Sequence, residues 1–219
     1  MKVTITIWDW PLRVFHWLLV IAVVGAYVTG KLGGNLTDWH GRLGGLVLGV
    51  LVFRLIWGFI GTTHARFSSF FPSISALRAY INGEWQGAGH NPVGGLAVFA
   101  LLATLIFLVA TGLFANDDIA FEGPLFNSID KALSDKLSGW HDWLVNGLLG
   151  LVAMHIAAIV FYQRIKKTNL LLPMLTGKKQ LPNYLQSAEI GRVGILPIAL
   201  TLLIAVAVVW TVWQGELSI

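Results

Sequence analysis

Two histidines of the sequence lie fourteen residues apart within one apolar segment, His141 and His155. On an α-helix, fourteen residues end about 40° short of four full turns, so both side chains share a helix face and lie roughly 21 Å apart along the axis. Two more histidines, His16 and His40, lie near the ends of other apolar segments. Neutral imidazole binds haem iron well, and two axial histidines fill both faces of the iron, which favours electron transfer over oxygen binding. The four residues therefore predict two haems, each held by two histidines.

The segments that carry these histidines have the composition of an integral membrane protein. Of the 219 residues, 56% are hydrophobic and 12% are charged, whereas a soluble domain has about 25% charged residues. The apolar runs are long and do not alternate with polar residues, which favours helices over a barrel. We predict an all-α integral membrane protein with spans at about 11–30, 39–60, 92–114, 139–163 and 193–213.

The formal net charge of +4 is explained by membrane topology, so no nucleic-acid partner is expected. Lys and Arg concentrate at the N-terminus, between the second and third spans, and between the fourth and fifth. The positive-inside rule then predicts a cytoplasmic N-terminus and a C-terminus on the outer side. The segment 116–138 becomes an acidic external loop, which would suit either a docking surface or an ordinary solvated loop.

This topology pairs the histidines by depth. His16 lies near the cytoplasmic end of the first span and His155 about two turns from that end of the fourth, so they are expected to ligate an inner haem iron. His40 and His141 begin the second and fourth spans from the outer side, so they are expected to ligate an outer haem iron. The chain has no cysteine, which excludes thiolate-held iron–sulfur clusters and covalent c-type haem.

Three other residues are candidates for contact with haem. Gly44 follows His40 by one helical turn and would leave room for a macrocycle. Arg54, fourteen residues after His40, would reach the inner level, where it either binds a haem propionate or extends to the cytoplasmic interface. Arg13 lies three residues before His16 on the same helix face, and positive-inside anchoring explains it as well as a propionate contact does.

The loop between the second and third spans holds the alternative ligands, His64 and His90. In such positions, capping or hydrogen bonding within the loop is the commoner use of the side chain. Apolar residues between 70 and 81 repeat at helical spacing, which predicts a short amphipathic helix on the cytoplasmic face. Asp9 or Trp10 and Asn91 precede prolines and are suited to cap the first and third spans.

Several stretches of the chain are similar to one known family. They read WDWPLRVFHW from Trp8, GTTHARF from Gly61, GHNPVGG from Gly89, WHDWLVNGLLGLVAMHIAA from Trp140 and TNLLLPMLTGKK from Thr168. These stretches resemble the bacterial di-haem b-type cytochromes, which comprise the cytochrome b-561 proteins and the cytochrome b subunits of nickel–iron hydrogenases. The resemblance covers residues 8 to about 180.

The resemblance implies a four-helix bundle that binds two b haems, with one histidine from the first helix, one from the second and two from the fourth. These positions correspond to His16, His40, His141 and His155. Residues 1–180 would form this core with its cytoplasmic loops. Residues 181–219 would be an extension that carries the fifth transmembrane helix.

The resemblance also implies a function in the bacterial inner membrane. The chain would carry electrons between the quinone pool and a periplasmic cytochrome or dehydrogenase subunit, as an electron-transfer subunit and not a stand-alone catalyst. Two alternatives stay open: a superoxide:quinone oxidoreductase that acts alone, and a membrane-anchor cytochrome b subunit of a hydrogenase. Lys131 and Lys136 would attract superoxide, yet acidic residues outnumber them in the same loop. Glycine-rich helices and the fifth span would permit a homo-oligomer.

Overall fold

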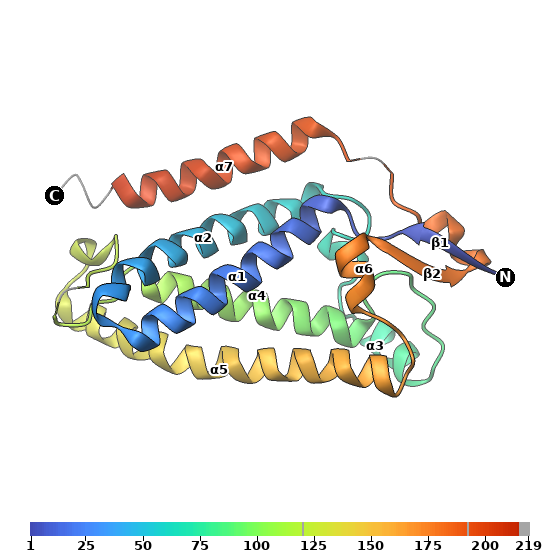
Figure 1. The fold of residues 1–219 in the computed structure, drawn as a ribbon, viewed down its shortest axis with the longest axis horizontal. Helices are drawn as coiled ribbons and strands as arrows, with labels where there is room; N and C mark the ends of the chain where they lie inside the picture. Colours follow the sequence, from blue (N-terminus) through green and yellow to red (C-terminus); the bar gives the residue numbers. More distant parts are fainter. Residues whose placement is uncertain (120, 192, 215–219) are drawn as a thin grey trace. The chain divides into compact units, whose positions relative to one another are not determined.

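The structure is a computed structural model that describes residues 1–119, 121–191 and 193–214. Within these residues, five helices are long and apolar enough to cross a membrane, which confirms the predicted all-α membrane fold (Figure 1). They are α1 (Trp10–Leu32), α2 (Thr37–Ile60), α4 (Pro92–Gly112), α5 (Lys131–Arg164) and α7 (Ile195–Gln214).

Helix α5 begins at Lys131, well before the predicted start near residue 139. Its first turns are too polar to belong to an apolar run, so hydropathy does not detect them. They are nevertheless helical, and the side chain of Lys131 binds Asp135 one turn later at 2.8 Å. Ion pairs at this spacing stabilise an exposed helix.

Shorter elements complete the fold. Helix α3 (Ile74–Ile81) confirms the predicted amphipathic helix, and α6 (Leu171–Thr176) follows α5. Strands β1 (Lys2–Thr6) and β2 (Lys178–Pro182) pair antiparallel. In the described part of the chain, 3-10 turns lie at Gly34–Leu36, Phe67–Ser69, Phe126–Ser128 and Asn183–Ala188.

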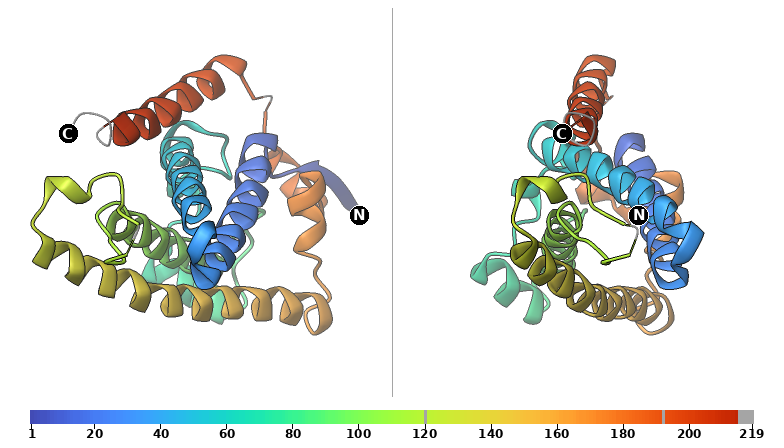
Figure 2. Two further views of the ribbon diagram at one scale, coloured as in Figure 1. Left: turned by 60° about the vertical axis from the view of Figure 1, so that its left-hand side comes forward. Right: turned by 90° about the vertical axis from the view of Figure 1, so that its left-hand side faces the viewer.

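The β1–β2 sheet was not predicted. Each strand has five residues, which is too short for an alternating pattern to stand out beside long apolar runs. Pairing buries Ile5 and Leu181, and the N–H groups of Ile7 and Trp8 donate to the carbonyl oxygen of Gly177. Figures 1 and 2 show β1, β2 and α6 gathered around the start of α1.

The predicted capping residues act as expected at two helix starts. The carboxylate of Asp9 accepts a hydrogen bond from the N–H of Leu12 at 2.7 Å. The side-chain oxygen of Asn91 accepts from the N–H of Gly94, also at 2.7 Å. Each bond satisfies one of the N–H groups that a helix start leaves without an intrahelical partner.

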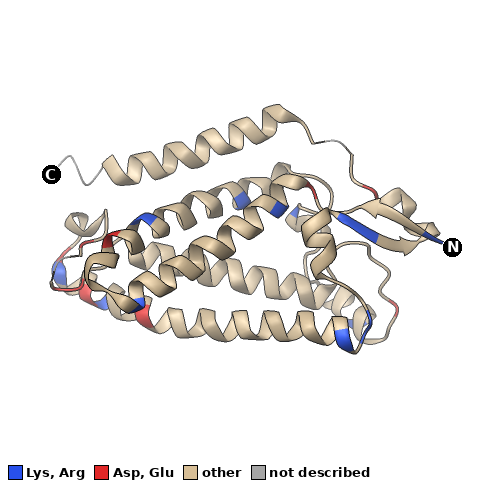
Figure 3. Cartoon of the chain, viewed as in Figure 1, with Lys and Arg blue, Asp and Glu red and all other residues tan. Residues whose placement is uncertain are grey.

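The chain packs as two compact units, and each long helix contributes residues to both. The first unit holds most of the Lys and Arg residues, and the second holds most of the Asp and Glu residues (Figure 3). The first unit comprises Met1–Val14, Arg54–Leu101 and Leu151–Ala199. The second comprises Phe15–Phe53, Leu102–Gly150 and the described part of Leu200–Ile219.

In the second unit, α7 packs against α2 at two glycines. A methyl group at Gly45 would lie 2.6 Å from the ring of Trp213, and one at Gly49 would lie 3.1 Å from Val209. Small residues let helices approach closely, which increases the van der Waals packing between helices in lipid. The part of α7 from Leu200 onward is therefore packed within the second unit.

Candidate functional site

His40 and His141 come together in the second unit, from the first turn of α2 and from α5. Their ring centroids are 6.0 Å apart and the rings are nearly perpendicular, at 84°. Two imidazoles that bind one metal ion through nitrogen atoms at about 2 Å each have centroids about 6 Å apart. The spacing of this pair therefore suits two ligands of one metal ion.

Each of these rings is held by a backbone carbonyl group. Nδ1 of His40 lies 2.8 Å from the oxygen of Ala26, and Nδ1 of His141 lies 2.9 Å from the oxygen of Leu108. A carbonyl oxygen only accepts, so each Nδ1 carries the hydrogen and Nε2 of the neutral ring keeps its lone pair. Metal-binding histidines commonly show this arrangement, in which the second ring nitrogen donates to a carbonyl or carboxylate. The donor chemistry of the pair thus fits haem iron.

Glycines make room around the two rings. A Cβ at Gly30 would lie 2.7 Å from Nδ1 of His40, and one at Gly112 would lie 3.0 Å from Cε1 of His141. A larger residue at either position would push the ring away from its carbonyl partner. At Gly44, one turn after His40, a Cβ would meet nothing within 4 Å. No other group therefore covers the backbone at Gly44. A flat macrocycle could lie against it.

The other two predicted ligands lie in different units. His16 is half-buried in the second unit, with its ring edge-on to Trp17 at a centroid distance of 5.1 Å. His155 is half-buried in the first unit. Their pairing at one iron stays a prediction.

Arg54 is buried in the first unit, with 2% of its surface exposed. Its guanidinium carbon lies 4.6 Å from the ring centroid of Phe67. Asp9 is itself buried and accepts hydrogen bonds from Trp57 at 3.1 Å and Thr62 at 2.5 Å. Arg54 therefore does not extend to the protein surface. The predicted propionate contact stays open.

Arg13 holds α6 against the start of α1. Its terminal nitrogen Nη1 donates to the carbonyl oxygen of Leu175, and its guanidinium lies beside Gly177. This contact between Arg13 and α6 was not predicted, because it depends on a backbone group far along the chain.

His64 hydrogen bonds within the first unit, with Nε2 2.8 Å from the carbonyl oxygen of Ala188. Loop hydrogen bonding, the use expected from its position, is therefore what the structure shows.

His90 is held between aromatic rings. Its centroid lies 4.5 Å from that of Trp8 and 4.7 Å from that of Phe70. Nδ1 is buried and has no hydrogen-bond partner among the residues that the structure describes. Burial, and then the positive charges of Arg54 and Lys179, lower the pKa of His90 to about 3. The ring is therefore neutral at physiological pH, and its aromatic setting could not be read from the sequence.

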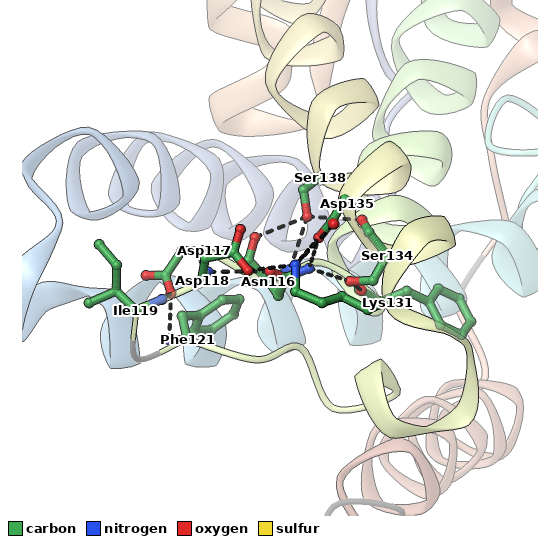
Figure 4. A network of polar contacts seen from close by, with 10 residues as sticks. Asn116, Asp117, Asp118, Ile119, Phe121, Lys131, Ser134, Asp135 and Ser138 are labelled. Carbon is green, nitrogen blue, oxygen red and sulfur yellow. Dashed lines mark hydrogen bonds and ion pairs between the residues drawn. The ribbon is translucent and has the colours of Figure 1, made fainter.

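A network of polar contacts organises the acidic loop between α4 and α5 (Figure 4). The side-chain amide of Asn116 donates to Ser134 at 2.6 Å and to Asp135 at 3.0 Å. Lys131 binds Asp118 at 2.6 Å as well as Asp135. The positive charge of Lys131 is therefore neutralised by two carboxylates.

A pocket of about 670 Å³ opens beside this network in the second unit. Arg42, Glu122, Phe121 and Trp213 are among the residues that line it. The ring of Phe121 also lies edge-on to His40, at a centroid distance of 6.3 Å. Phe121 thus connects the wall of the pocket to the histidine pair. Among the described residues, no three His, Asp or Glu side chains gather as in a multi-ligand metal centre.

The family comparison matches the part of the chain that carries these features. Residues 7–177 match the prokaryotic cytochrome b561 family. The chain belongs to this family. It is therefore a multi-pass bacterial membrane protein that uses haem b and takes part in membrane electron transfer. All four predicted ligands lie within the matched range, and α7 lies outside it.

Three curated relatives show what the chain is similar to. A probable Ni/Fe-hydrogenase B-type cytochrome subunit of Bradyrhizobium diazoefficiens is 24% identical over 217 residues, covering 81% of this chain and 86% of the relative. A subunit of the same description from Rhizobium leguminosarum is 20% identical over 212 residues, covering 80% and 89%. The probable Ni/Fe-hydrogenase 1 B-type cytochrome subunit of Escherichia coli is 23% identical over 141 residues, covering 48% and 57%. No solved structure matches the chain.

Proposed function

We propose that this cytochrome carries electrons across the membrane through two b haems. His40 and His141 would hold the outer haem iron, and His16 and His155 would hold the inner one. The observation that carries the proposal is the His40–His141 pair, whose 6.0 Å spacing and carbonyl-bound Nδ1 atoms suit two ligands of one metal ion. When bound, haem b supplies a one-electron couple at its iron.

The residues of the chain orient the ligands. The carbonyl groups of Ala26 and Leu108 fix the tautomer of each outer histidine and make its Nε2 more basic. Gly44 would leave room for the macrocycle of the outer haem. In the first unit, the buried cation of Arg54 is the proposed partner of an inner haem propionate, because a guanidinium binds a carboxylate through strong charge-assisted hydrogen bonds.

The proposed electron path joins the quinone pool to a redox subunit outside the membrane. Three relatives are described as hydrogenase B-type cytochrome subunits, which supports a hydrogenase or another dehydrogenase as that subunit. The concentration of Lys and Arg in the first unit supports a cytoplasmic N-terminus. We place the outer partner over the pocket beside Phe121, because this ring touches His40.

Independent superoxide oxidation is the weaker proposal for the same site. It needs an excess of positive charge at the outer surface to attract a small anion. Lys131 is paired with Asp118 and Asp135, and Lys136 lies over the ring of Trp140. An electron-transfer subunit is therefore favoured over a stand-alone catalyst.

Proteoliposomes test this function. Vesicles with reduced quinol in the bilayer and membrane-impermeant ferricyanide outside should reduce ferricyanide at a rate that depends on the haem-loaded protein. The His40→Ala variant should lose this rate, and His64→Gln should keep it. Equal rates in wild type and His40→Ala, or haem reduction by superoxide but not by quinol, would contradict the proposal.

A further inference from the structure

The first unit has a second pocket, of about 420 Å³, between the end of α3 and the end of α5. Its walls include the rings of Tyr80, Trp85 and Tyr162, and Lys166 provides positive charge. None of the predicted haem ligands lines this pocket. It also shares no lining residue with the pocket beside His40. The combination of aromatic walls and a cation indicates a ligand that is part apolar and part anionic.

Hydrogen bonds hold the aromatic walls in place. The hydroxyl groups of Tyr80 and Tyr162 bind each other, and the side-chain amide of Asn91 donates to the hydroxyl of Tyr162 at 2.7 Å. Asn91 is fixed in turn, because its oxygen caps α4. Tyr80 also meets Trp85 edge-on at a centroid distance of 6.3 Å. The pocket is therefore formed before a ligand arrives, which lowers the entropic cost of binding.

The tyrosine pair keeps a hydrogen-bond donor for the ligand. Two hydroxyl groups carry two hydrogens, and the bond between Tyr80 and Tyr162 uses one of them. The bond from Asn91 uses an oxygen lone pair and no hydroxyl hydrogen. Among the described residues, no other acceptor is seen for the second hydrogen. Together with the ammonium group of Lys166, the pocket thus offers two kinds of donor to an anion.

The surroundings of the pocket are those of a membrane interface. Helix α5 ends at Arg164, so Lys166 lies just beyond the end of a membrane span. Ile81, which also lines the pocket, is 78% exposed, and Ile165 is 66% exposed. Exposed apolar groups beside aromatic and basic residues are typical of the level where lipid headgroups meet acyl chains.

We propose that this pocket binds the phosphate headgroup of an anionic phospholipid. Lys166 and one tyrosine hydroxyl donate to the phosphate oxygens, while the ring of Trp85 packs against the glycerol region and Ile81 against an acyl chain. Basic pockets at the cytoplasmic ends of transmembrane helices commonly bind anionic headgroups. No predicted haem ligand lines this pocket. The proposal of lipid binding therefore does not depend on the proposal of haem ligation.

Native mass spectrometry of the detergent-solubilised, haem-loaded protein tests the site. Phosphatidylglycerol and phosphatidylcholine with identical acyl chains are the probes, and inorganic phosphate is the soluble control. We expect phosphatidylglycerol to bind at least about five-fold more tightly than phosphatidylcholine, as one nearby cation allows. Lys166→Gln should remove most of this preference and Lys166→Arg should keep it. Lys178→Gln, which removes an exposed charge outside the pocket, should also keep it.

Three results would overturn the proposal. They are equal binding of the two lipids by wild type, equal loss in Lys166→Gln and Lys178→Gln, and binding of inorganic phosphate as tightly as phosphatidylglycerol. The haem absorption spectrum of each variant reports whether it has folded. If Lys166→Gln does not fold, Trp85→Leu removes a wall of the pocket without changing the charge, and unaltered lipid preference in that variant counts equally against the site.

Discussion

Backbone carbonyl groups position the imidazoles of the outer pair. Ala26 and Leu108 act through their main-chain oxygens, which hold His40 and His141 at Nδ1. Because any residue has such an oxygen, the side chains at 26 and 108 give no signal in the sequence. Gly30 does leave a signal in the sequence, because only glycine fits there: a Cβ would lie 2.7 Å from Nδ1 of His40.

Gly44 allows a test that separates haem binding from folding. In the structure a Cβ at this position would meet nothing within 4 Å, and replacing a helical glycine stabilises a helix by up to about 1 kcal/mol. Gly44→Leu should therefore fold at least as stably without haem as the wild type. With haem it should lose the outer group, because the leucine side chain would occupy the space of the macrocycle. Haem per polypeptide, measured by pyridine haemochromogen, should fall by half.

Gly139→Leu is the matched control for this variant. Gly139 also lies in a helix, and a Cβ there would meet nothing within 4 Å. The control should keep the full haem content. Equal haem content in both variants would show that the macrocycle does not lie beside Gly44.

At the scale of elements, Asp9 joins the start of α1 to the end of α2. Its carboxylate caps α1 at Leu12 and accepts from Trp57 and Thr62.

Asp9→Ala should lower the free energy of unfolding by about 3 kcal/mol. A lost cap costs about 1 kcal/mol, and two buried donors left without an acceptor cost about 1 kcal/mol or more each. Equilibrium denaturation in detergent, followed by near-ultraviolet circular dichroism, measures the change. Glu84→Ala, at an exposed loop position, should change stability by about 0.5 kcal/mol or less. A similar small change in Asp9→Ala would contradict the role given to its carboxylate.

The transmembrane helices could be predicted from the sequence because their signals are local. Elements that form through contacts between distant segments could not. Apolar runs and capping residues are local signals, so the five spans and the caps at Asp9 and Asn91 are confirmed. The β1–β2 sheet pairs segments that are far apart in the sequence, and no local pattern predicts such pairing. For the candidate site, helix periodicity placed the histidines, but it could not show the carbonyl partners or the aromatic contacts of His90.

Across the whole molecule, the two units differ in charge. The first is rich in Lys and Arg and the second in Asp and Glu. A buried neutral histidine within the basic unit should make the protein sensitive to acid.

The lowered pKa of His90 predicts that the free energy of unfolding decreases as the pH falls. Its pKa is about 3 in the folded protein, below the ordinary value of about 6.5 that an unfolded chain would show. The unfolded state therefore binds a proton first as the pH falls, so stability is complete above about pH 6.5 and declines below it. Between pH 6.5 and 5 the loss from this residue should be about 2 kcal/mol.

Unfolding of wild type and His90→Phe across this pH range measures the contribution. Phenylalanine keeps an aromatic ring between Trp8 and Phe70 and has no group to titrate. The difference in unfolding free energy between the two proteins should change by about 2 kcal/mol as the pH falls from 6.5 to 5. A difference that does not vary with pH would show that His90 is not held neutral in the fold.

The pairing of four histidines at two irons is tested most directly by haem content and redox titration of single variants. Wild type should contain two b haems per polypeptide with resolvable midpoint potentials. His40→Ala and His141→Ala should lose the same haem, and His16→Ala and His155→Ala should lose the other. His64→Gln should keep both. One haem per wild-type polypeptide, or loss of the same haem from His40→Ala and His155→Ala, would contradict the two-haem pairing.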